Sequence, residues 1–233
     1  QSSPRSGWTS HINLIGLNSL TPASASVATG VNITASAVTG INSDQGFLST
    51  DVGRTISMNN GKATITARTS ATVVVVSITT AFTNTDAQTA WRLGGWSNTT
   101  GYPRTVTFFE QRLIFAGTTN NPQTIFGSQS GLYTNFDTGD ASAADAFVYT
   151  IAANRVNIIR WLAPARDLIV GTAGGEFKVG RPTGEPLKPT NVNITQQTTY
   201  GGWTTEPTQI GNIILFVQKQ RKKIREFAYK FED

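Results

Sequence analysis

Cysteine is absent from this 233-residue sequence, and histidine occurs only once, as His11. The chain therefore has no disulfide and no thiolate metal site, and a metal centre built on several imidazoles is excluded. Charged residues are scarce, at 14% compared with roughly 25% in an average soluble domain. The longest apolar run, residues 72–78, is too short to cross a bilayer as a helix.

The sequence also lacks the apolar spacing of a long amphipathic helix. Short runs rich in Val, Ile, Thr and Phe instead alternate with Gly, Asn and Pro, as is typical of strands and turns. At 38% hydrophobic residues the chain can bury a core. We therefore predict an all-β fold that is divided into two modules.

The N-terminal part predicts a lead-in followed by a small β module. Residues 1–29 are rich in Ser, Thr, Ala and Gly and are expected to form a loose lead-in or one edge strand. Residues 30–95 predict a small β-sandwich or barrel. Within it, Asn59-Asn60-Gly61 predicts a hairpin turn, because these residues tolerate a positive φ. The run 73–76, apolar on both faces, predicts a strand that is buried on both sides or lies at a covered edge.

The C-terminal part, residues 96–233, contains a repeated unit. Each copy is an apolar strand preceded by a polar turn and followed by another strand, and the copies begin at Leu113, Leu168 and Ile214. They recur about every 50 residues, close to the roughly 40–50 residues of propeller repeats. This part therefore predicts a partial β-propeller with about three blade-like antiparallel sheets, fewer than the four or more that close a ring.

Residues 90–97, in which two tryptophans flank a glycine pair, are expected to be the hinge between the two modules. Paired exposed tryptophans could bind a sugar or a nucleobase, but their commoner role is to seal a seam between sheets. We assign a structural role to the residues of this stretch and of the first repeat that stand out most, namely Trp91, Trp96, Tyr102, Arg112, Leu113 and Gly117.

Patterns typical of catalysis or metal binding are weak. Asp137, Asp140 and Asp145 share a polar stretch that departs from the EF-hand spacing, so we interpret it as a solvated loop. The serine-containing stretch 127–131 lacks the strand-turn-helix context of a nucleophile elbow. The glycine-rich stretch 171–175 lacks the lysine of a phosphate loop and predicts a hairpin turn. We expect no enzymatic activity, no cofactor and no bound metal.

The strongest charged feature is a basic cluster at a predicted hairpin tip near the C-terminus. There the side chains could contact the phosphates of a passing DNA duplex without reading bases, which agrees with a formal net charge of +5. The alternative, of equal weight, is a solvated turn that protects a strand edge from aggregation. The cluster consists of Lys219, Arg221, Lys222, Lys223 and Arg225.

Several stretches share the motifs of one known family. They are Trp91-Arg-Leu-Gly-Gly-Trp-Ser, the run 101–118, Pro122-Gln-Thr-Ile-Phe-Gly-Ser, Gly131-Leu-Tyr-Thr-Asn-Phe, and the runs 167–177 and 215–229, with 47–54 and 61–66 upstream. Together they resemble the tail tubular protein B, or tail nozzle, proteins of short-tailed bacteriophages. Members of that family have more chain on both sides, so we expect this chain to be a fragment.

The resemblance implies a structural virion protein that is made in the host cytoplasm and has no membrane anchor. It implies a homo-oligomer, a hexameric ring that binds the portal, its adaptor and other tail proteins. Double-stranded DNA would pass non-specifically through the channel of that ring.

Two rival functions stay open at this point. A carbohydrate-binding β module would place exposed aromatic side chains, such as Tyr200 and Trp203, against glycans of the host surface. A polysaccharide depolymerase would use two of the few carboxylates as acid and nucleophile, but the sequence singles out no such pair.

Overall fold

The computed structural model describes residues 9–13, 18–138, 142–152 and 157–228. The chain divides into two compact units, unit 1 (Gln1–Tyr102) and unit 2 (Pro103–Asp233). Strands dominate both units, and the one helical element among the described residues is the 3-10 turn η1 (Ser49–Asp51). The predicted all-β class is confirmed. In the described part of the chain, no helix has the length and apolar character needed to cross a membrane.

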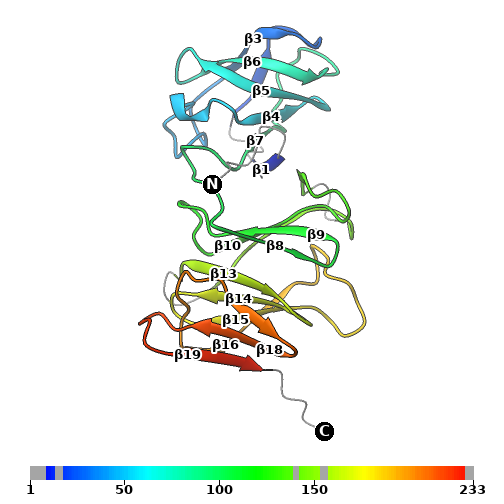
Figure 1. Cartoon of the computed structure of the whole chain (residues 1–233). Helices are drawn as coiled ribbons and strands as arrows, with labels where there is room; N and C mark the ends of the chain where they lie inside the picture. Colours follow the sequence, from blue (N-terminus) through cyan, green and yellow to red (C-terminus); the bar gives the residue numbers. More distant parts are fainter. Residues whose placement is uncertain (1–8, 14–17, 139–141, 153–156, 229–233) are drawn as a thin grey trace. The chain divides into compact units, whose positions relative to one another are not determined.

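Unit 1 forms one antiparallel sheet that curls into a half-barrel (Figure 1), where a sandwich or barrel was expected. The register between β5 and β6 shifts twice, at Lys62/Ala63 and at Ile65/Ala67, and such bulges bend and twist a sheet. The strands lie in the order β1-β7-β4-β5-β6-β3-β2. Their bounds are β1 (Thr9–Asn13), β2 (Leu20–Pro22), β3 (Thr29–Ala35), β4 (Thr55–Met58), β5 (Gly61–Arg68), β6 (Val73–Thr80) and β7 (Arg92–Gly94).

Alternate residues of β3, β5 and β6 point into the core of unit 1. In β6, Val74, Val76 and Ile78 are buried while the residues between them are half-buried. The prediction for the run 73–76 is therefore wrong, because β6 is an inner strand between β5 and β3 with only one fully buried face. The predicted hairpin turn is confirmed, since Asn59 and Asn60 adopt φ of 47° and 58° between β4 and β5.

Two predicted boundaries in unit 1 differ from the structure. Residues 1–29, expected as a loose lead-in or one edge strand, contribute β1, the edge strand β2 and the first residue of β3 to the sheet. Residues 90–97, expected as a hinge, contain β7, an inner strand that pairs with β1 and β4. Both elements are short, with five residues in β1 and three in β7, so their sequences carry little strand pattern of their own. Their pairing depends on strands far away in the sequence.

Unit 2 consists of three antiparallel sheets in series, seen in green, yellow and orange-red in Figure 1. We call them sheets A, B and C. Sheet A contains β8 (Thr105–Phe109), β9 (Arg112–Ala116), β10 (Thr124–Gly127) and β12 (Phe147–Thr150). Sheet B contains β13 (Ile159–Pro164), β14 (Leu168–Thr172), β15 (Glu176–Gly180) and β16 (Asn193–Thr198). Sheet C contains β17 (Thr208–Ile210), β18 (Ile213–Val217) and β19 (Ile224–Ala228), and the short β11 (Asn135–Phe136) lies between β10 and β12 in the chain.

The inner strand β14 of sheet B is buried on both faces. Along β14, Leu168 and Val170 join a core that also contains Ile114 and Ile125 of sheet A. Ile169, which points the other way, joins a second core with residues of sheet C, namely Ile214, Phe216 and Phe227. Because successive side chains of a strand point to opposite faces, a strand between two sheets needs apolar residues at successive positions, as β14 has from Leu168 to Val170.

The three repeated segments of the sequence occupy corresponding positions in the three sheets. They form β9, β14 and β18, and each pairs with the strands directly before and after it in the chain. Each repeat is thus the second strand of an antiparallel sheet and lies between the strands that precede and follow it in the chain. The periodicity of the sequence reflects a real structural repeat within unit 2.

Candidate functional site

The basic cluster lies at the tip of the hairpin that joins β18 to β19. Gln218 and Lys223 close the tip, where the N–H of Gln218 donates to the carbonyl of Lys223 at 2.9 Å. The N–H of Arg221 donates to the carbonyl of Gln218 at 2.8 Å, and Arg221 adopts a left-handed φ of 61°. The side chains of Lys219, Arg221, Lys222 and Lys223 are exposed, as predicted for a hairpin tip, and Arg225 is half-buried.

Two aromatic rings support guanidinium groups of this cluster. The guanidinium carbon of Arg221 lies 4.7 Å from the ring centroid of Trp203, and that of Arg160, from β13, lies 5.5 Å from the same ring. The guanidinium carbon of Arg225 lies 4.2 Å from the ring centroid of Tyr200. A cation within about 6 Å of an aromatic face is attracted by the ring quadrupole. Arginines from sheets B and C therefore converge on Trp203 and Tyr200, which we call the aromatic platform.

The platform is placed by the two glycines that separate its aromatic residues. The N–H of Gly202 donates to the carbonyl of Thr172 in sheet B, and the N–H of Trp203 donates to the carbonyl of Val217 in sheet C. A Cβ at Gly202 would lie 2.2 Å from Nε1 of Trp161, and one at Gly201 would lie 2.5 Å from a backbone oxygen. Only glycine fits this close approach, so the chain can fix Trp203 across the ends of both sheets.

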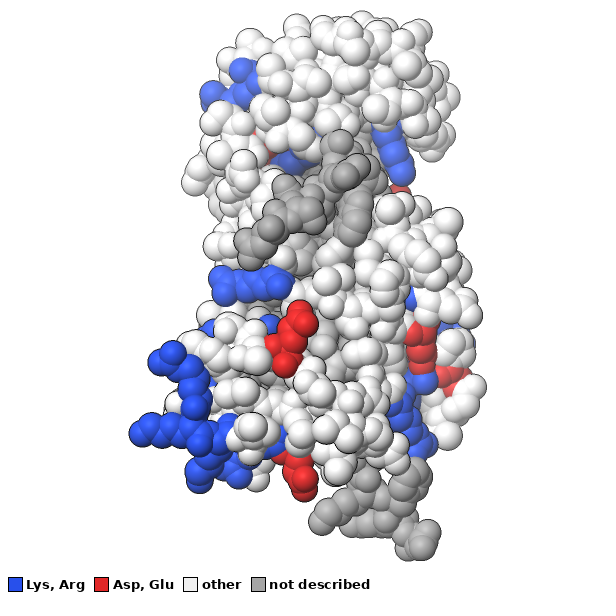
Figure 2. Space-filling model, viewed as in Figure 1, with Lys and Arg blue, Asp and Glu red and all other residues white. Residues whose placement is uncertain are grey.

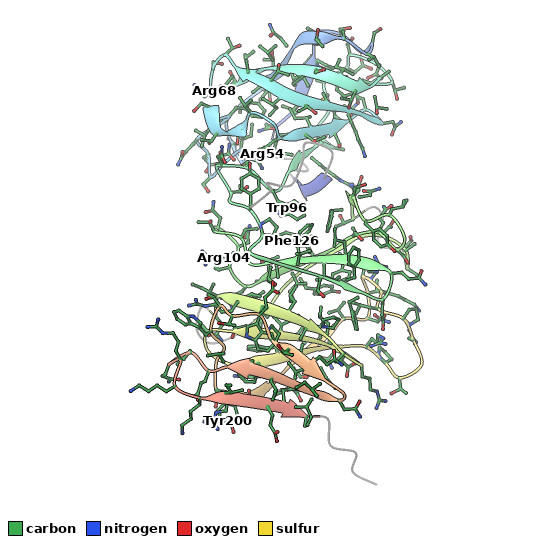
Figure 3. The ribbon with its side chains drawn as sticks, viewed as in Figure 1. Arg54, Arg68, Trp96, Arg104, Phe126 and Tyr200 are labelled. Carbon is green, nitrogen blue, oxygen red and sulfur yellow. The ribbon has the colours of Figure 1, made fainter. Side chains whose placement is uncertain are left out.

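The surface around the platform is strongly positive. Figure 2 shows Lys and Arg side chains gathered on one side of unit 2 near the sheet C hairpin, and Tyr200, labelled in Figure 3, lies in the same region. In the described part of the chain, no salt bridge is formed by Arg160, Arg221 or the three lysines of the tip. Their positive charge is therefore available to an anionic partner.

A buried carboxyl lies beneath the platform. Glu176, on β15, is fully buried and accepts a hydrogen bond from the hydroxyl of Thr198. Burial raises the pKa of Glu176 above its ordinary value near 4.5, while the hydrogen bond from Thr198 acts in the opposite direction. The acid therefore links β15 to β16 within sheet B.

Arg112, Leu113 and Gly117 have structural positions in and after β9. The side chain of Arg112 is 2% exposed and donates hydrogen bonds to the carbonyls of Ser128, Ala143 and Asp145. It thus holds the loop between β10 and β12 against sheet A. Leu113 is buried in the same strand, and Gly117 has a left-handed φ of 69° where the chain turns toward β10.

The remaining structural candidates lie in unit 1. Trp91 is 1% exposed, packs in the core with Phe47, and donates from Nε1 to the side-chain oxygen of Asn18 at 3.0 Å. Trp96 is 8% exposed. Tyr102 is 37% exposed and belongs to none of the core clusters of the described residues, so a core role for it is not supported.

The stretches that only weakly resemble catalytic or metal-binding motifs have structural roles. Ser128 is fully buried, accepts a hydrogen bond from the N–H of Leu113 and donates to a backbone carbonyl. Residues 171–175 form the predicted turn between β14 and β15. Asp145 accepts a hydrogen bond from the N–H of Ser142, whereas Asp140 and the side chain of His11 lie outside the described residues. The described residues hold no group of three or more His, Cys, Asp or Glu that could bind a metal.

A cleft of about 720 Å³ also opens in unit 2, next to the turn between β8 and β9. Its main charged groups neutralise one another. Arg181 forms ion pairs with Glu110 and, at 3.3 Å, with Asp167, and Glu110 also accepts the N–H of Leu187 at 2.7 Å. The cleft therefore offers less unpaired charge than the hairpin cluster, which we take as the candidate site.

Sequence reasoning found the basic residues of this site but not the platform. The sequence indicates Trp203 and Tyr200 as candidate sugar-binding residues, and no pattern in it points to Arg160. The pair Gly201-Gly202 next to an aromatic residue is a local signal of close packing. Arg160 carries no such signal, because only the stacking of sheet B on sheet C brings it to Trp203.

Comparisons with known proteins add no assignment to this geometry. No protein-family model matches the chain, and a search of curated proteins finds no significant relative.

Proposed function

We propose that this chain is part of a structural virion protein, a protomer of the tail nozzle ring of a short-tailed bacteriophage. In this proposal, unit 2 is a segment of a β-propeller and sheets A, B and C are consecutive blades. The ring surrounds the channel through which DNA leaves the virion and binds the portal, the adaptor and other tail proteins.

The observation that carries the proposal is the two-sided burial of β14, in sheet B, between sheets A and C. Propeller blades are antiparallel sheets of consecutive strands that pack face to face in series. Sheets A and B each have four strands, and neighbouring strands are consecutive in the chain throughout sheets B and C and, in sheet A, from β8 to β10. The same stretches carry the motifs that resemble the nozzle family, so fold pattern and sequence motifs point to one family.

The basic hairpin fits a conduit for DNA. Contacts from lysine and arginine to phosphates are independent of base sequence, so they let a duplex move past without a fixed register. The exposed tip presents such side chains on a short, rigid turn. We therefore propose phosphate contacts of Lys219, Arg221, Lys222, Lys223 and Arg225 with passing DNA.

The glycan-binding alternative receives less support. Stacking on a sugar requires an open aromatic face, whereas guanidinium groups lie over the rings of both Trp203 and Tyr200. The contacts are most extensive at Trp203, where two guanidinium groups lie over one ring and would compete with a sugar.

Electron microscopy tests the proposal. The polypeptide encoded by the complete reading frame would be imaged alone and with the portal–adaptor complex encoded beside it. We expect rings with an axial channel wide enough for duplex DNA that dock onto this complex. A polypeptide that neither forms rings nor docks would refute the nozzle assignment.

A further inference from the structure

We propose that Arg160, Arg221 and Arg225, held on Trp203 and Tyr200, form a binding site for the phosphate groups of duplex DNA. We call this set of five residues the stacked-arginine site. It extends the basic hairpin by one arginine from another sheet and by the two rings. The choice of DNA as the source of the phosphates rests on the proposed function, whereas the phosphate chemistry rests on the geometry alone.

The guanidinium donors of the site are largely unused within the protein. Among the described residues, Arg225 donates from Nε to the side-chain oxygen of Gln218 at 3.1 Å, while Arg160 and Arg221 donate to no protein acceptor. The Nε atom of Arg160 is buried and lacks a hydrogen-bond partner. A phosphate cannot reach this enclosed atom, so Arg160 would offer its two terminal NH2 groups, which have no protein acceptor and are not among the buried unpartnered atoms.

The rings position the donors. A guanidinium stacked on an aromatic face keeps its N–H groups pointing outward along its own plane, where they can bind two phosphate oxygens at once. Because the ring already restricts the side chain, less conformational entropy is lost when the phosphate binds. A lysine at the same place would keep the charge but lose both the stacking and the paired donors. The site is therefore specific for arginine, beyond its positive charge.

Arg221 has a further property that makes it testable. It adopts a left-handed φ of 61° at the hairpin tip, a conformation that glycine adopts without strain. Replacement by glycine should therefore leave the hairpin at least as stable while it removes a stacked guanidinium. Loss of binding in that variant would not be explained by misfolding.

The spread of the site across two sheets predicts a link between binding and stability. Arg160 belongs to β13 of sheet B, and Arg221 and Arg225 belong to the hairpin of sheet C. A DNA backbone whose phosphates contact all three arginines would join the two sheets. Since a ligand that binds only the folded state stabilises it, DNA should raise the melting temperature of the chain.

The experiment measures binding of a fluorescently labelled 20-base-pair duplex to the whole chain by anisotropy, over a series of salt concentrations. The variants are Arg221→Lys, Arg221→Gly and Trp203→Leu. The matched control is Arg104→Gln, which removes the charge of an exposed arginine on another part of unit 2. A sulfated polysaccharide, heparin, serves as the competing polyanion, and thermal melts establish that each variant is folded.

We expect Arg221→Lys, which keeps the net charge, to weaken DNA binding about tenfold, the effect of losing one charge-assisted contact. Arg221→Gly should weaken it at least as much and lower the salt slope by about 0.9 for each lost phosphate contact. Trp203→Leu should also weaken binding, and Arg104→Gln should change it little.

Two results would overturn the proposal. Equal binding by Arg221→Lys and the wild type would show that charge alone matters, and heparin binding that is tighter and equally dependent on Arg221 would assign the site to a sulfated glycan. Failure of the nozzle assignment has a different signature. In that case the wild-type polypeptide forms no ring but still binds DNA, and Arg221→Lys still weakens this binding. The phosphate site would then hold although the nozzle function does not.

Discussion

The buried ion pair of unit 1 gives the sharpest prediction about stability. Asp51 and Arg54 are both fully enclosed, with the Nη1 of Arg54 2.9 Å from the Oδ1 of Asp51. The other donors to the Asp51 carboxylate are Thr99 Oγ1 at 2.9 Å, Asn42 Nδ2 at 2.7 Å and the N–H of Leu48 at 2.8 Å. This carboxylate therefore joins η1, the preceding loop and the end of unit 1.

The substitution Asp51→Asn keeps the shape but replaces one oxygen by an NH2 group. An NH2 group in place of Oδ2 would face two donors, Asn42 Nδ2 and the N–H of Leu48, and one in place of Oδ1 would face the guanidinium of Arg54. In either orientation, Arg54 loses its counter-charge. Leaving one member of a buried pair without its partner costs about 3–5 kcal/mol. Because the amide retains one acceptor, we expect a loss of about 3 kcal/mol, or a fall in Tm of more than about 10 °C in a unit of this size.

Urea unfolding of the whole chain, followed by far-UV circular dichroism, measures this loss. Hydrogen exchange of peptides that cover residues 42–54 assigns it to unit 1. The control is Asp86→Asn, which removes the same charge from an exposed side chain of unit 1 and should change stability by less than about 0.5 kcal/mol. A loss below about 1 kcal/mol in Asp51→Asn would refute the reasoning.

Three further predictions concern unit 2. Arg112→Met should cost about 3 kcal/mol in urea unfolding, because loop carbonyls lose a charged donor, whereas Arg104→Met at an exposed site should cost little. Gly171→Ala should destabilise the chain strongly in thermal melts, since a Cβ would lie 1.9 Å from the Trp161 indole. A Tm within about 2 °C of the wild-type value would contradict this. Because the pKa of Glu176 is raised on folding, the folded state binds its proton more tightly, and its stability relative to Glu176→Gln should fall as the pH rises above about 4.5. A pH-independent difference in unfolding free energy between the two proteins would show that Glu176 does not titrate as inferred.

Local signals in the sequence account for much of the fold. The turn at Asn59-Asn60 and the strands β9, β14 and β18 were predicted because the residues that specify them are adjacent in the chain. The same holds for the turn between β14 and β15. Period-two alternation and turn residues are properties of a few neighbouring positions, so they can be read without knowing the partners.

Long-range pairing accounts for what could not be predicted. β7 looks like a hinge because Gly94 and Gly95 follow Trp91 and Leu93, and only its pairing with β1 and β4 makes it an inner strand. The site shows the same limit. The basic run at the hairpin tip is contiguous and was found, whereas Arg160 reaches Trp203 only because two sheets pack together.

The two-sided burial of β14 also restricts how this chain can change in evolution. A one-residue insertion or deletion within β14 would turn Leu168 and Val170 toward sheet C and Ile169 toward sheet A, because such a slip exchanges the two faces of a strand. Both cores would then be mismatched at once. Length variation should therefore be confined to connections such as the one between β15 and β16, while the middle strand of the stack keeps a fixed length.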